Sequence, residues 1–174
     1  MDMLKQHIRS IPDFPKKGII FRDITTLLKD ARVLQEAVHA LCEPFRQQDV
    51  DQVVAIEARG FIMGGAIACE LGAGFVPIRK SGKLPAETLQ KTYELEYGTD
   101  TLAVHTDAIA KEENVLMFDD LLATGGTMAA SCEMVESLGG NIVACAFLIE
   151  LDALEGREKL ECYELLSLVH YETA

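Results

Sequence analysis

Residues 115–131 read Val-Leu-Met-Phe-Asp-Asp-Leu-Leu-Ala-Thr-Gly-Gly-Thr-Met-Ala-Ala-Ser. The four apolar residues at 115–118 predict a buried strand, and two adjacent carboxylates, Asp119 and Asp120, follow where that strand ends. Residues 128–138 carry apolar side chains at helical spacing and predict an amphipathic helix. The chain therefore runs from a strand through a short polar loop into a helix, which is a local arrangement that binds phosphate.

The loop between this strand and helix contains two glycines flanked by threonines, Thr124, Gly125, Gly126 and Thr127. Glycines let the backbone turn its N–H groups inward, and the N-terminus of the helix adds partial positive charge. The threonine hydroxyls can donate to the same phosphate oxygens. No lysine follows the glycines, which excludes a Walker A loop, and the G-x-G-x-x-G dinucleotide fingerprint is absent. The loop therefore predicts a site for a monophosphate.

The two adjacent carboxylates, Asp119 and Asp120, repel phosphate and should face another part of the ligand. A phosphatase-type nucleophile pair would usually space its aspartates one residue apart, whereas these are adjacent. Vicinal sugar hydroxyls suit the pair, because each carboxylate accepts O–H hydrogen bonds. A ribose 5-phosphate would then lie with its phosphate in the loop and its 2- and 3-hydroxyls on the acids.

The composition limits the classes of partner and of location. The chain has 174 residues, of which 49% are hydrophobic, and this suits one domain with a sizeable core. A formal net charge of −12 disfavours nucleic acid and anionic membranes as partners. The five scattered cysteines lack a C-x-x-C motif and predict reduced, mostly buried thiols. No signal pattern and no apolar run of membrane-spanning length are found, so we expect a cytoplasmic protein.

Two further strands are expected to end in polar loops. Residues 53–56 form an apolar strand that turns tightly into a helix over 61–71, and Arg59 in the turn is placed to meet an anion. Residues 74–78 form another strand, which ends in the basic run 79–83. A solvated basic turn explains that run equally well, so it is only a second candidate for anion binding.

The remaining periodicity alternates helices with strands. A helix over 31–48 should be kinked or split by Pro44, and further strands are expected at 101–105, 142–149 and 165–169. This alternation predicts an α/β fold with a mostly parallel central sheet flanked by helices. In such sheets, ligands bind beyond the carboxyl ends of the strands.

Three segments fit this alternation less clearly. Apolar residues at positions 4, 8 and 11 predict a short N-terminal helix that Pro12 stops. Residues 18–24 are either a strand edge or an extended loop that packs two apolar side chains into the core. Residues 84–98 lack clear periodicity, and a long irregular stretch in a compact domain is often a functional lid. The four histidines show no ligand spacing and are interpreted as incidental.

The signature at 115–131 resembles the phosphoribosyl-pyrophosphate (PRPP) motif of the type I phosphoribosyltransferases. Within that family, the chain is most similar to the adenine-specific members, from Ile8 to Tyr171. The matched segments are Pro-Asp-Phe-Pro at 12–15, Gly-Ile-Ile-Phe-Arg-Asp at 18–23, Glu-Ala-Arg-Gly-Phe at 57–61, Arg-Lys-Ser-Gly-Lys-Leu-Pro at 79–85, Leu-Glu-Tyr-Gly at 95–98 and Gly-Arg-Glu-Lys-Leu at 156–160. Met117 and Phe118 are bulkier than expected before the acids, which bears on packing rather than chemistry.

The resemblance implies transfer of the phosphoribosyl group of PRPP to N9 of adenine, giving AMP and diphosphate. Magnesium would accompany PRPP, with no direct side-chain ligand. The implied fold is one domain over residues 1–174, with a base-binding hood over 1–30 and a mobile lid over 80–100. A homodimer is implied because Arg79 and Lys83 would reach pyrophosphate in a neighbouring subunit's site.

The resemblance also implies a role for each matched residue. The 5-phosphate would be held by Ala123, Thr124, Gly125, Gly126 and Thr127, and the ribose by Asp119 and Asp120. Pyrophosphate would be held by Ala58, Arg59, Arg79 and Lys83, and family members have a non-proline cis peptide in the loop of Ala58. Adenine would be bound by Ile20, Phe21 and Arg22. The lid would carry Glu96 and Tyr97, and the catalytic residues would be Glu96 and Arg59.

The specificity for adenine follows from hydrogen-bond logic applied to the base segment. Adenine presents an N6 amino donor beside an N1 acceptor, which a backbone C=O of Ile20 and a backbone N–H of Arg22 would match, while Phe21 stacks on the base. Oxopurines present these groups in the opposite order and would leave buried backbone groups unpaired, at about 1–3 kcal/mol each. Glu96 is the favoured residue to accept the adenine proton or to orient the base near N7 and N9, and a solvated lid carboxylate is the alternative.

Two alternative functions share the PRPP signature. A transferase acting on hypoxanthine, guanine or xanthine would differ only in the base segment and the lid. A PRPP-sensing regulator would bind the ligand without turnover, but it would need a DNA-binding module and a basic face. The strongly acidic composition disfavours that regulator.

Overall fold

A computed structural model describes residues 2–94 and 98–173. Glu96 and Tyr97, expected on the lid, lie outside the described residues. The strands are β1 Arg9–Pro12, β2 Ile20–Asp23, β3 Gln52–Ile56, β4 Gly74–Lys80, β5 Thr88–Glu94, β6 Thr99–His105, β7 Asn114–Leu122, β8 Asn141–Leu151 and β9 Leu165–Tyr171. The helices are α1 Asp2–Gln6, α2 Thr25–Leu28, α3 Ala31–Cys42, α4 Gly60–Leu71 and α5 Gly126–Leu138, with short 3₁₀ turns η1 Glu43–Phe45, η2 Asp152–Leu154 and η3 Gly156–Leu160.

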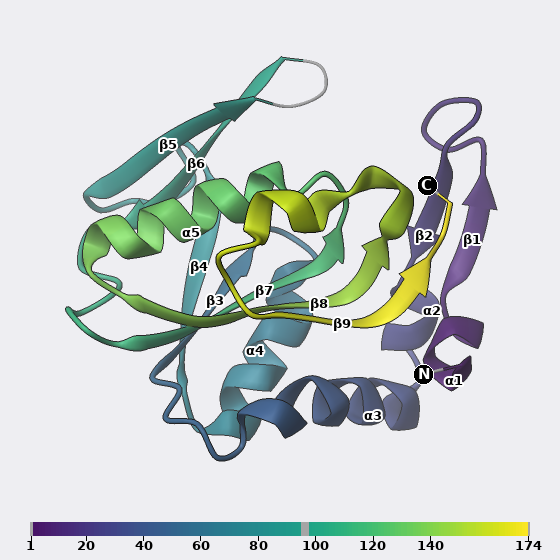
Figure 1. The fold of residues 1–174 in the computed structure, drawn as a ribbon, viewed down its shortest axis with the longest axis horizontal. Helices are drawn as coiled ribbons and strands as arrows, with labels where there is room; N and C mark the ends of the chain where they lie inside the picture. The colour runs from purple at the N-terminus through teal and green to yellow at the C-terminus, as the bar shows by residue number, and fades with distance from the viewer. Residues whose placement is uncertain (1, 95–97, 174) are drawn as a thin grey trace.

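The central sheet has seven strands in the order β5-β6-β4-β3-β7-β8-β9 (Figure 1). The strands β4, β3, β7, β8 and β9 pair in parallel, which confirms the predicted α/β fold with a mostly parallel sheet. Strand β6 runs antiparallel to both β4 and β5. The expected strands at 53–56, 74–78, 101–105, 142–149 and 165–169 all lie within observed strands.

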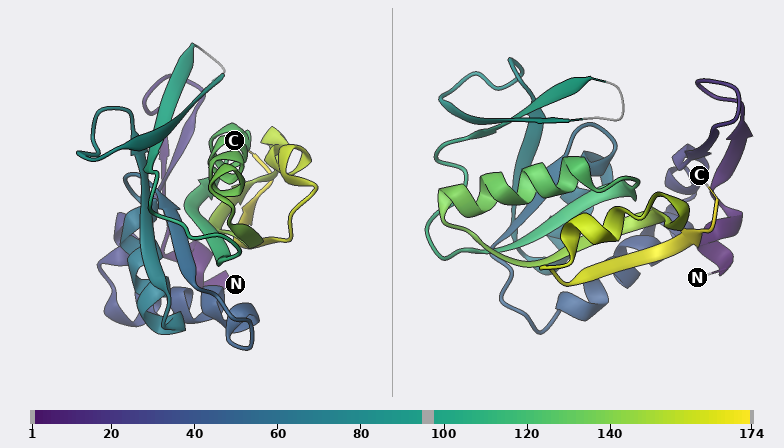
Figure 2. Two further views of the ribbon diagram at one scale, coloured as in Figure 1. Left: turned by 90° about the vertical axis from the view of Figure 1, so that its left-hand side faces the viewer. Right: turned by 45° about the horizontal axis from the view of Figure 1, so that its top comes forward.

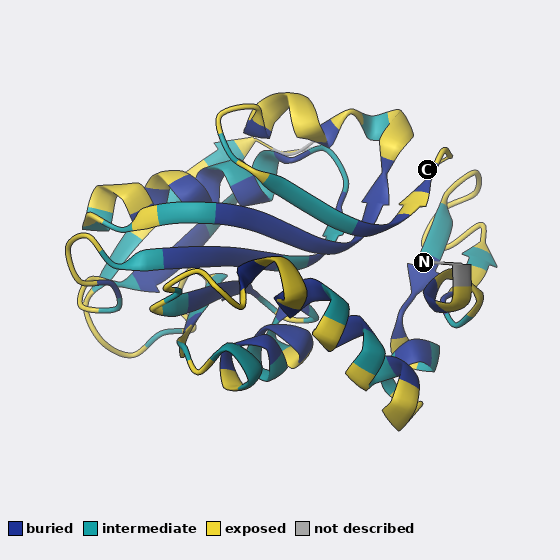
Figure 3. Cartoon of the chain, turned by 60° about the horizontal axis from the view of Figure 1, so that its bottom comes forward, coloured by how far each residue is buried: buried dark blue, intermediate teal, exposed yellow. Residues whose placement is uncertain are grey.

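Helices cover both faces of this sheet. Figures 1 and 2 show α5 on one face and α3 with α4 on the other. The adjacent residues Met117 and Phe118 of β7 are both fully buried and pack into opposite cores, Met117 with the α5 side and Phe118 with the α3–α4 side. Side chains alternate across a strand, so the two bulky residues fill two separate layers. The central strands are accordingly buried along most of their length (Figure 3).

The N-terminal segment differs from the expectation of one helix stopped by Pro12. Helix α1 ends at Gln6, and Arg9–Pro12 form strand β1, which pairs antiparallel with β2. Pro12 is the last residue of a strand whose only sheet partner among the described residues is β2, a position where proline is tolerated. The segment 18–24, left open between strand and loop, therefore contains a strand, and the two strands form a small separate sheet (Figure 1).

The expectation of an irregular stretch at 84–98 is wrong, because Thr88–Glu94 forms strand β5 along the full length of β6. The side chains of Leu89 and Tyr93 alternate with more exposed neighbours and pack against the core on the α5 side. By contrast, the expected break near Pro44 is confirmed, since α3 ends at Cys42 and a 3₁₀ turn contains the proline. Among the described residues, no helix is long and apolar enough to cross a membrane.

Candidate active site

The phosphate loop joins the end of β7 to the start of α5. Gly125 precedes the helix with a backbone φ of 75°, a conformation that residues other than glycine rarely adopt. A cavity of about 70 Å³ lies at this turn and includes all five residues expected to hold the 5-phosphate, namely Ala123, Thr124, Gly125, Gly126 and Thr127. The cavity therefore lies at the N-terminus of α5, a position where backbone N–H groups can stabilise an anion.

The two adjacent acids differ in their surroundings. Asp120 is buried, with 5% of its surface exposed, while Asp119 is half-buried and accepts a hydrogen bond from the backbone N–H of Asp120. Burial raises the pKa of Asp119 well above its ordinary value, and the neighbouring Asp120 charge raises it further. Burial also raises the pKa of Asp120, although the Arg59 charge opposes that shift. The pair therefore carries a cost when both carboxylates are ionised.

The turn after β3 supplies the positive charge that faces these acids. The Nε atom of Arg59 lies 2.9 Å from Oδ2 of Asp120. The peptide bond between Glu57 and Ala58 is cis, as the family resemblance implied. This turn therefore presents Ala58 and Arg59, both expected to bind pyrophosphate, to the end of β7.

Arg79 and Lys83 both pair with Glu57 in the same turn. The Nε atom of Arg79 lies 2.9 Å and the Nζ atom of Lys83 lies 2.5 Å from the carboxylate of Glu57. Burial raises the pKa of Glu57, but hydrogen bonds from Lys83, the Lys80 backbone and Arg79 bring it below its ordinary value. Within one chain, the two cations thus hold the carboxylate of the turn.

A larger cavity of about 280 Å³ joins these groups into one site. It adjoins the phosphate cavity, because Asp119, Leu121 and Thr127 line both. Its lining combines the cis turn, the acidic pair and residues of the β5–β6 hairpin: Ile56, Glu57, Ala58, Arg59, Lys80, Tyr93, Asp100, Leu102, Asp119, Asp120, Leu121 and Thr127. The site lies where β3 and β7 end, as the parallel-sheet rule predicts.

The expected base segment lies on β2, beside this cavity. The guanidinium of Arg59 lies 5.2 Å from the ring centre of Phe21, which brings the segment next to the acidic pair. Ile20 and Arg22 are two residues apart, so their backbone groups face the same side of the strand. The buried Arg22 side chain donates to Ser10 Oγ at 2.6 Å and to the Thr173 carbonyl, and its guanidinium stacks on Tyr171.

Tyr93, Lys80 and Asp100 also line the larger cavity and had no individual role among the residues expected from the sequence. The hydroxyl of Thr127 donates to the hydroxyl of Tyr93 at 3.1 Å, which links the phosphate loop to strand β5. Lys80 Nζ lies 2.9 Å from Asp100 Oδ2 across β4 and β6. Recognition of β5 as a strand would have indicated Tyr93, and Lys80 belongs to the basic run already considered for anion binding.

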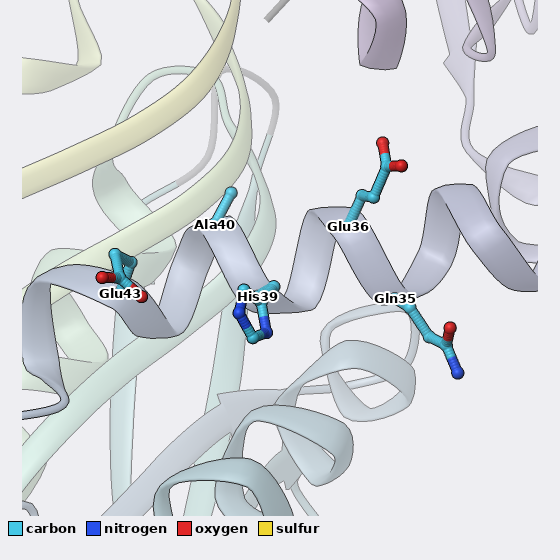
Figure 4. A pocket seen from close by; sticks show the side chains of 5 residues that line it. All are labelled: Gln35, Glu36, His39, Ala40 and Glu43. Carbon is cyan, nitrogen blue, oxygen red and sulfur yellow. The ribbon is translucent and has the colours of Figure 1, made fainter.

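A further hollow of about 370 Å³ lies along helix α3 (Figure 4). It is lined by Gln35, Glu36, His39, Ala40 and Glu43. None of the residues expected to bind substrate contributes to it, and its charged groups are carboxylates and one imidazole, which do not suit a phosphorylated ligand. The residues expected to bind substrate gather instead at the two cavities near the ends of β3 and β7.

Comparison with known proteins agrees with this geometry. The phosphoribosyl transferase domain family matches residues 23–173. An adenine phosphoribosyltransferase of Geobacter metallireducens is 60% identical over 171 residues, which cover 98% of this chain and 100% of that protein. The crystal structure of the adenine phosphoribosyltransferase of Thermoanaerobacter pseudethanolicus has a TM-score of 0.95 and 52% identity, covering 98% of this chain and 99% of that one.

A third relative was solved with ligands. The adenine phosphoribosyltransferase of Saccharomyces cerevisiae, complexed with an imino-altritol bisphosphate and adenine, has a TM-score of 0.88 and 39% identity, covering 97% of this chain and 96% of that one. The sequence similarity spans the parallel sheet, the phosphate loop and the cis turn alike. The chain belongs to the phosphoribosyltransferase family and, within it, to the adenine phosphoribosyltransferases.

Proposed function

We propose that this enzyme transfers the phosphoribosyl group of PRPP to N9 of adenine, giving AMP and diphosphate in purine salvage. The observation that carries the proposal is the shared lining of the two cavities, which sets a monophosphate site beside an acidic pair and an arginine. The yeast relative, whose bound compounds are an imino-altritol bisphosphate and adenine, supports the same pair of substrate classes.

The charges of the site support one orientation of PRPP. Its 5-phosphate occupies the loop of residues 123–127 at the N-terminus of α5, where backbone N–H groups and threonine hydroxyls can bind an anion. Its 2- and 3-hydroxyls donate to Asp119 and Asp120, and its pyrophosphate lies toward Ala58 and Arg59 in the larger cavity. Each group of the ligand then meets a partner of matching hydrogen-bond character.

Adenine is placed between the base segment and the ribose. The C=O of Ile20 accepts from the N6 amino group and the N–H of Arg22 donates to N1, while Phe21 packs on the ring. The proximity of Phe21 to Arg59 supports this placement, because it sets the base segment beside the pyrophosphate turn. An oxopurine would leave these backbone groups unpaired, at about 1–3 kcal/mol each.

The reaction is a displacement at C1 of the ribose. The bond from N9 to C1 forms as the bond from C1 to the pyrophosphate oxygen breaks, so that pyrophosphate leaves with the electron pair and C1 is inverted. Positive charge develops on the ribose ring, while the guanidinium of Arg59 stabilises the negative charge of the leaving group. Glu96 accepts the proton that adenine loses, or orients the base, and the lid over 80–100 excludes water.

Magnesium fits the chemistry of this edge. We expect no direct side-chain ligand, because Mg²⁺ usually keeps several waters and binds substrate phosphates, while the carboxylates of Asp119 and Asp120 remain on the ribose hydroxyls. When bound with PRPP, Mg²⁺ neutralises part of the pyrophosphate charge.

Arg79 and Lys83 complete the site in a homodimer. Their side chains are 35% and 49% exposed beside Glu57, so both can also reach an anion outside their own chain. The five cysteines are free thiols, which supports a reducing, cytoplasmic location.

The test is AMP formation from PRPP, Mg²⁺ and adenine, measured beside hypoxanthine, guanine and xanthine. Turnover with adenine alone supports the reaction and the placement of the base. Turnover with an oxopurine would contradict the roles of Ile20 and Arg22. Binding of PRPP without product would contradict the transferase function as a whole.

A further inference from the structure

The segment Gly156–Leu160, which forms η3, matches the family but has no role in the reaction as described above. It lies against the phosphate loop in direct backbone contact. A Cβ atom built on Gly125 would lie 2.3 Å from the Gly156 carbonyl oxygen, and one built on Gly156 would lie 2.1 Å from the Ala123 carbonyl oxygen. Neither position has room for a side chain, so the start of η3 packs directly against the backbone of the phosphate loop.

Two interactions fix η3 in that position. Leu160 is fully buried in the core on the α5 side. Nε of Arg157 lies 2.6 Å from Oε1 of Glu150, whose side chain is 5% exposed. A buried carboxylate paired with arginine is a costly contact to break, so the segment is held at both its first turn and its end.

This anchoring brings the ammonium group of Lys159 to the phosphate loop. A Cβ atom built on Gly126 would lie 3.9 Å from Lys159 Nζ. Within residues 2–94 and 98–173, Lys159 has no ion pair or hydrogen bond from its ammonium, whereas the nearby lysines Lys80, Lys83 and Lys91 pair with Asp100, Glu57 and Glu133. Lys159 is exposed and is therefore available to a ligand of the loop.

The phosphate cavity needs such a cation. Its lining contains no basic side chain, and it includes the carboxylate-bearing Asp119. A phosphate monoester carries a charge of about −1.5 to −2 at neutral pH, and the whole chain has a net charge of −12. Backbone N–H groups and the helix terminus supply only partial charge, so the ammonium of Lys159 beside Gly126 adds a full positive charge at the loop.

We propose that Lys159 binds the 5-phosphate of PRPP and of AMP, as the cationic partner of the Gly/Thr loop. This inference rests on the proposed function, because it concerns the phosphate end of the same site. It assigns the Gly-Arg-Glu-Lys-Leu segment a substrate-binding task, in which Arg157 and Leu160 position Lys159.

The experiment compares Lys159→Gln with Lys159→Arg, and uses Glu158→Gln as the matched control on the same turn. Calorimetric titration of AMP and of adenosine measures binding with and without the phosphate. We expect Lys159→Gln to weaken AMP binding about tenfold, as for a charged hydrogen bond, and to leave adenosine binding unchanged. Lys159→Arg should retain most of the AMP affinity, and Glu158→Gln should not weaken it.

Two results would overturn the inference. One is AMP affinity of Lys159→Gln within twofold of the unsubstituted enzyme. The other is an equal loss of AMP and adenosine affinity, which would show that Lys159 only supports the fold of the loop. Titration with ribose 5-phosphate separates this inference from the proposed function, because it tests Lys159 even if the enzyme makes no AMP from adenine.

Discussion

The guanidinium of Arg59 lies between two parts of the site, with Nε at 2.9 Å from Asp120 Oδ2 and its centre at 5.2 Å from the Phe21 ring. The residue expected to hold pyrophosphate therefore also pairs with a buried carboxylate that is expected to bind ribose. Pyrophosphate would compete with Asp120 for the same side chain, while the ribose hydroxyls would provide Asp120 with new donors. Binding of PRPP is thus expected to exchange one set of charge pairs for another.

The first prediction concerns Arg59→Gln. We expect a fall of about 10²-fold or more in kcat/KM for PRPP, because a transition-state charge partner is lost. Stability at neutral pH should also fall, because the buried Asp120 carboxylate is left without its cation. Steady-state kinetics and thermal unfolding measure the two effects. Arg32→Gln, which removes an exposed pair with Glu36, is the control, and equal behaviour of both variants would contradict the prediction.

The second prediction concerns the effect of Asp119→Asn on stability. The sign of that effect follows from the raised pKa of Asp119. An unfolded aspartate ionises near about pH 4, so above that pH the folded chain retains a proton that the unfolded chain has lost. The Asp119 carboxyl of the wild type therefore lowers the free energy of unfolding as the pH rises above about 4. Without PRPP, we expect Asp119→Asn to unfold at a higher temperature than wild type at neutral pH, with the difference vanishing below about pH 4.

The same Asp119→Asn variant should use PRPP poorly, because an amide is a weaker acceptor for ribose hydroxyls than a carboxylate. The KM for PRPP and the unfolding temperature from acid to neutral pH should be measured on one preparation. A destabilised variant with normal PRPP affinity would exclude the ribose-binding role.

The third prediction concerns the hood, through Asp23 on β2. Hydrogen bonds from Arg9 and from the backbone of Thr25 lower the pKa of Asp23 to about 2. The stabilisation is present above the ordinary aspartate pKa and is lost as the pH falls from about 4 to about 2. We expect Arg9→Gln to lower the free energy of unfolding at neutral pH. The variant should also lose less of that free energy than the wild type as the pH falls from about 4 to about 2. Unfolding curves at several pH values check it, and parallel curves for both proteins would contradict it.

The fourth prediction concerns the hydrogen bond that the hydroxyl of Thr127 donates to Tyr93. A phosphate in the loop would take over the hydroxyl of Thr127, so this bond must be given up on binding. Tyr93→Phe should therefore tighten AMP binding by about twofold to tenfold, the equivalent of one neutral hydrogen bond. Thr127→Val should weaken it instead. Titration with AMP measures both, and weaker binding by Tyr93→Phe would mean that its hydroxyl contacts the ligand.

The centre of the fold could be predicted from sequence because its signals are local. The strand, the glycine turn and the helix each depend on residues close in the chain, and all three elements are present in the expected order. Their bounds differ from the expectation, because β7 continues through both acids to Leu122 and the helix begins two residues early, at Gly126. The break at Pro44 is similarly local, because the proline ring and its missing N–H interrupt a helix whatever surrounds it.

The parts that were missed depend on partners distant in sequence. Residues 9–12 were grouped with the first helix, but they pair with β2 instead. The strand at 88–94 is half-exposed, so its alternation is visible only once β6 is beside it. Likewise, the contacts of Arg59 with Asp120 and of Tyr93 with Thr127 join segments more than 30 residues apart, which no local pattern reports.

The side chain of Arg22 connects the hood to the last residues of the chain, through Thr173 and the ring of Tyr171. A chimaera that takes only residues 1–30 from an oxopurine-specific enzyme would therefore lack the matching partners of Arg22 at Tyr171 and Thr173. An exchange of base preference is expected to require the hood and residues 171–173 to be transferred together.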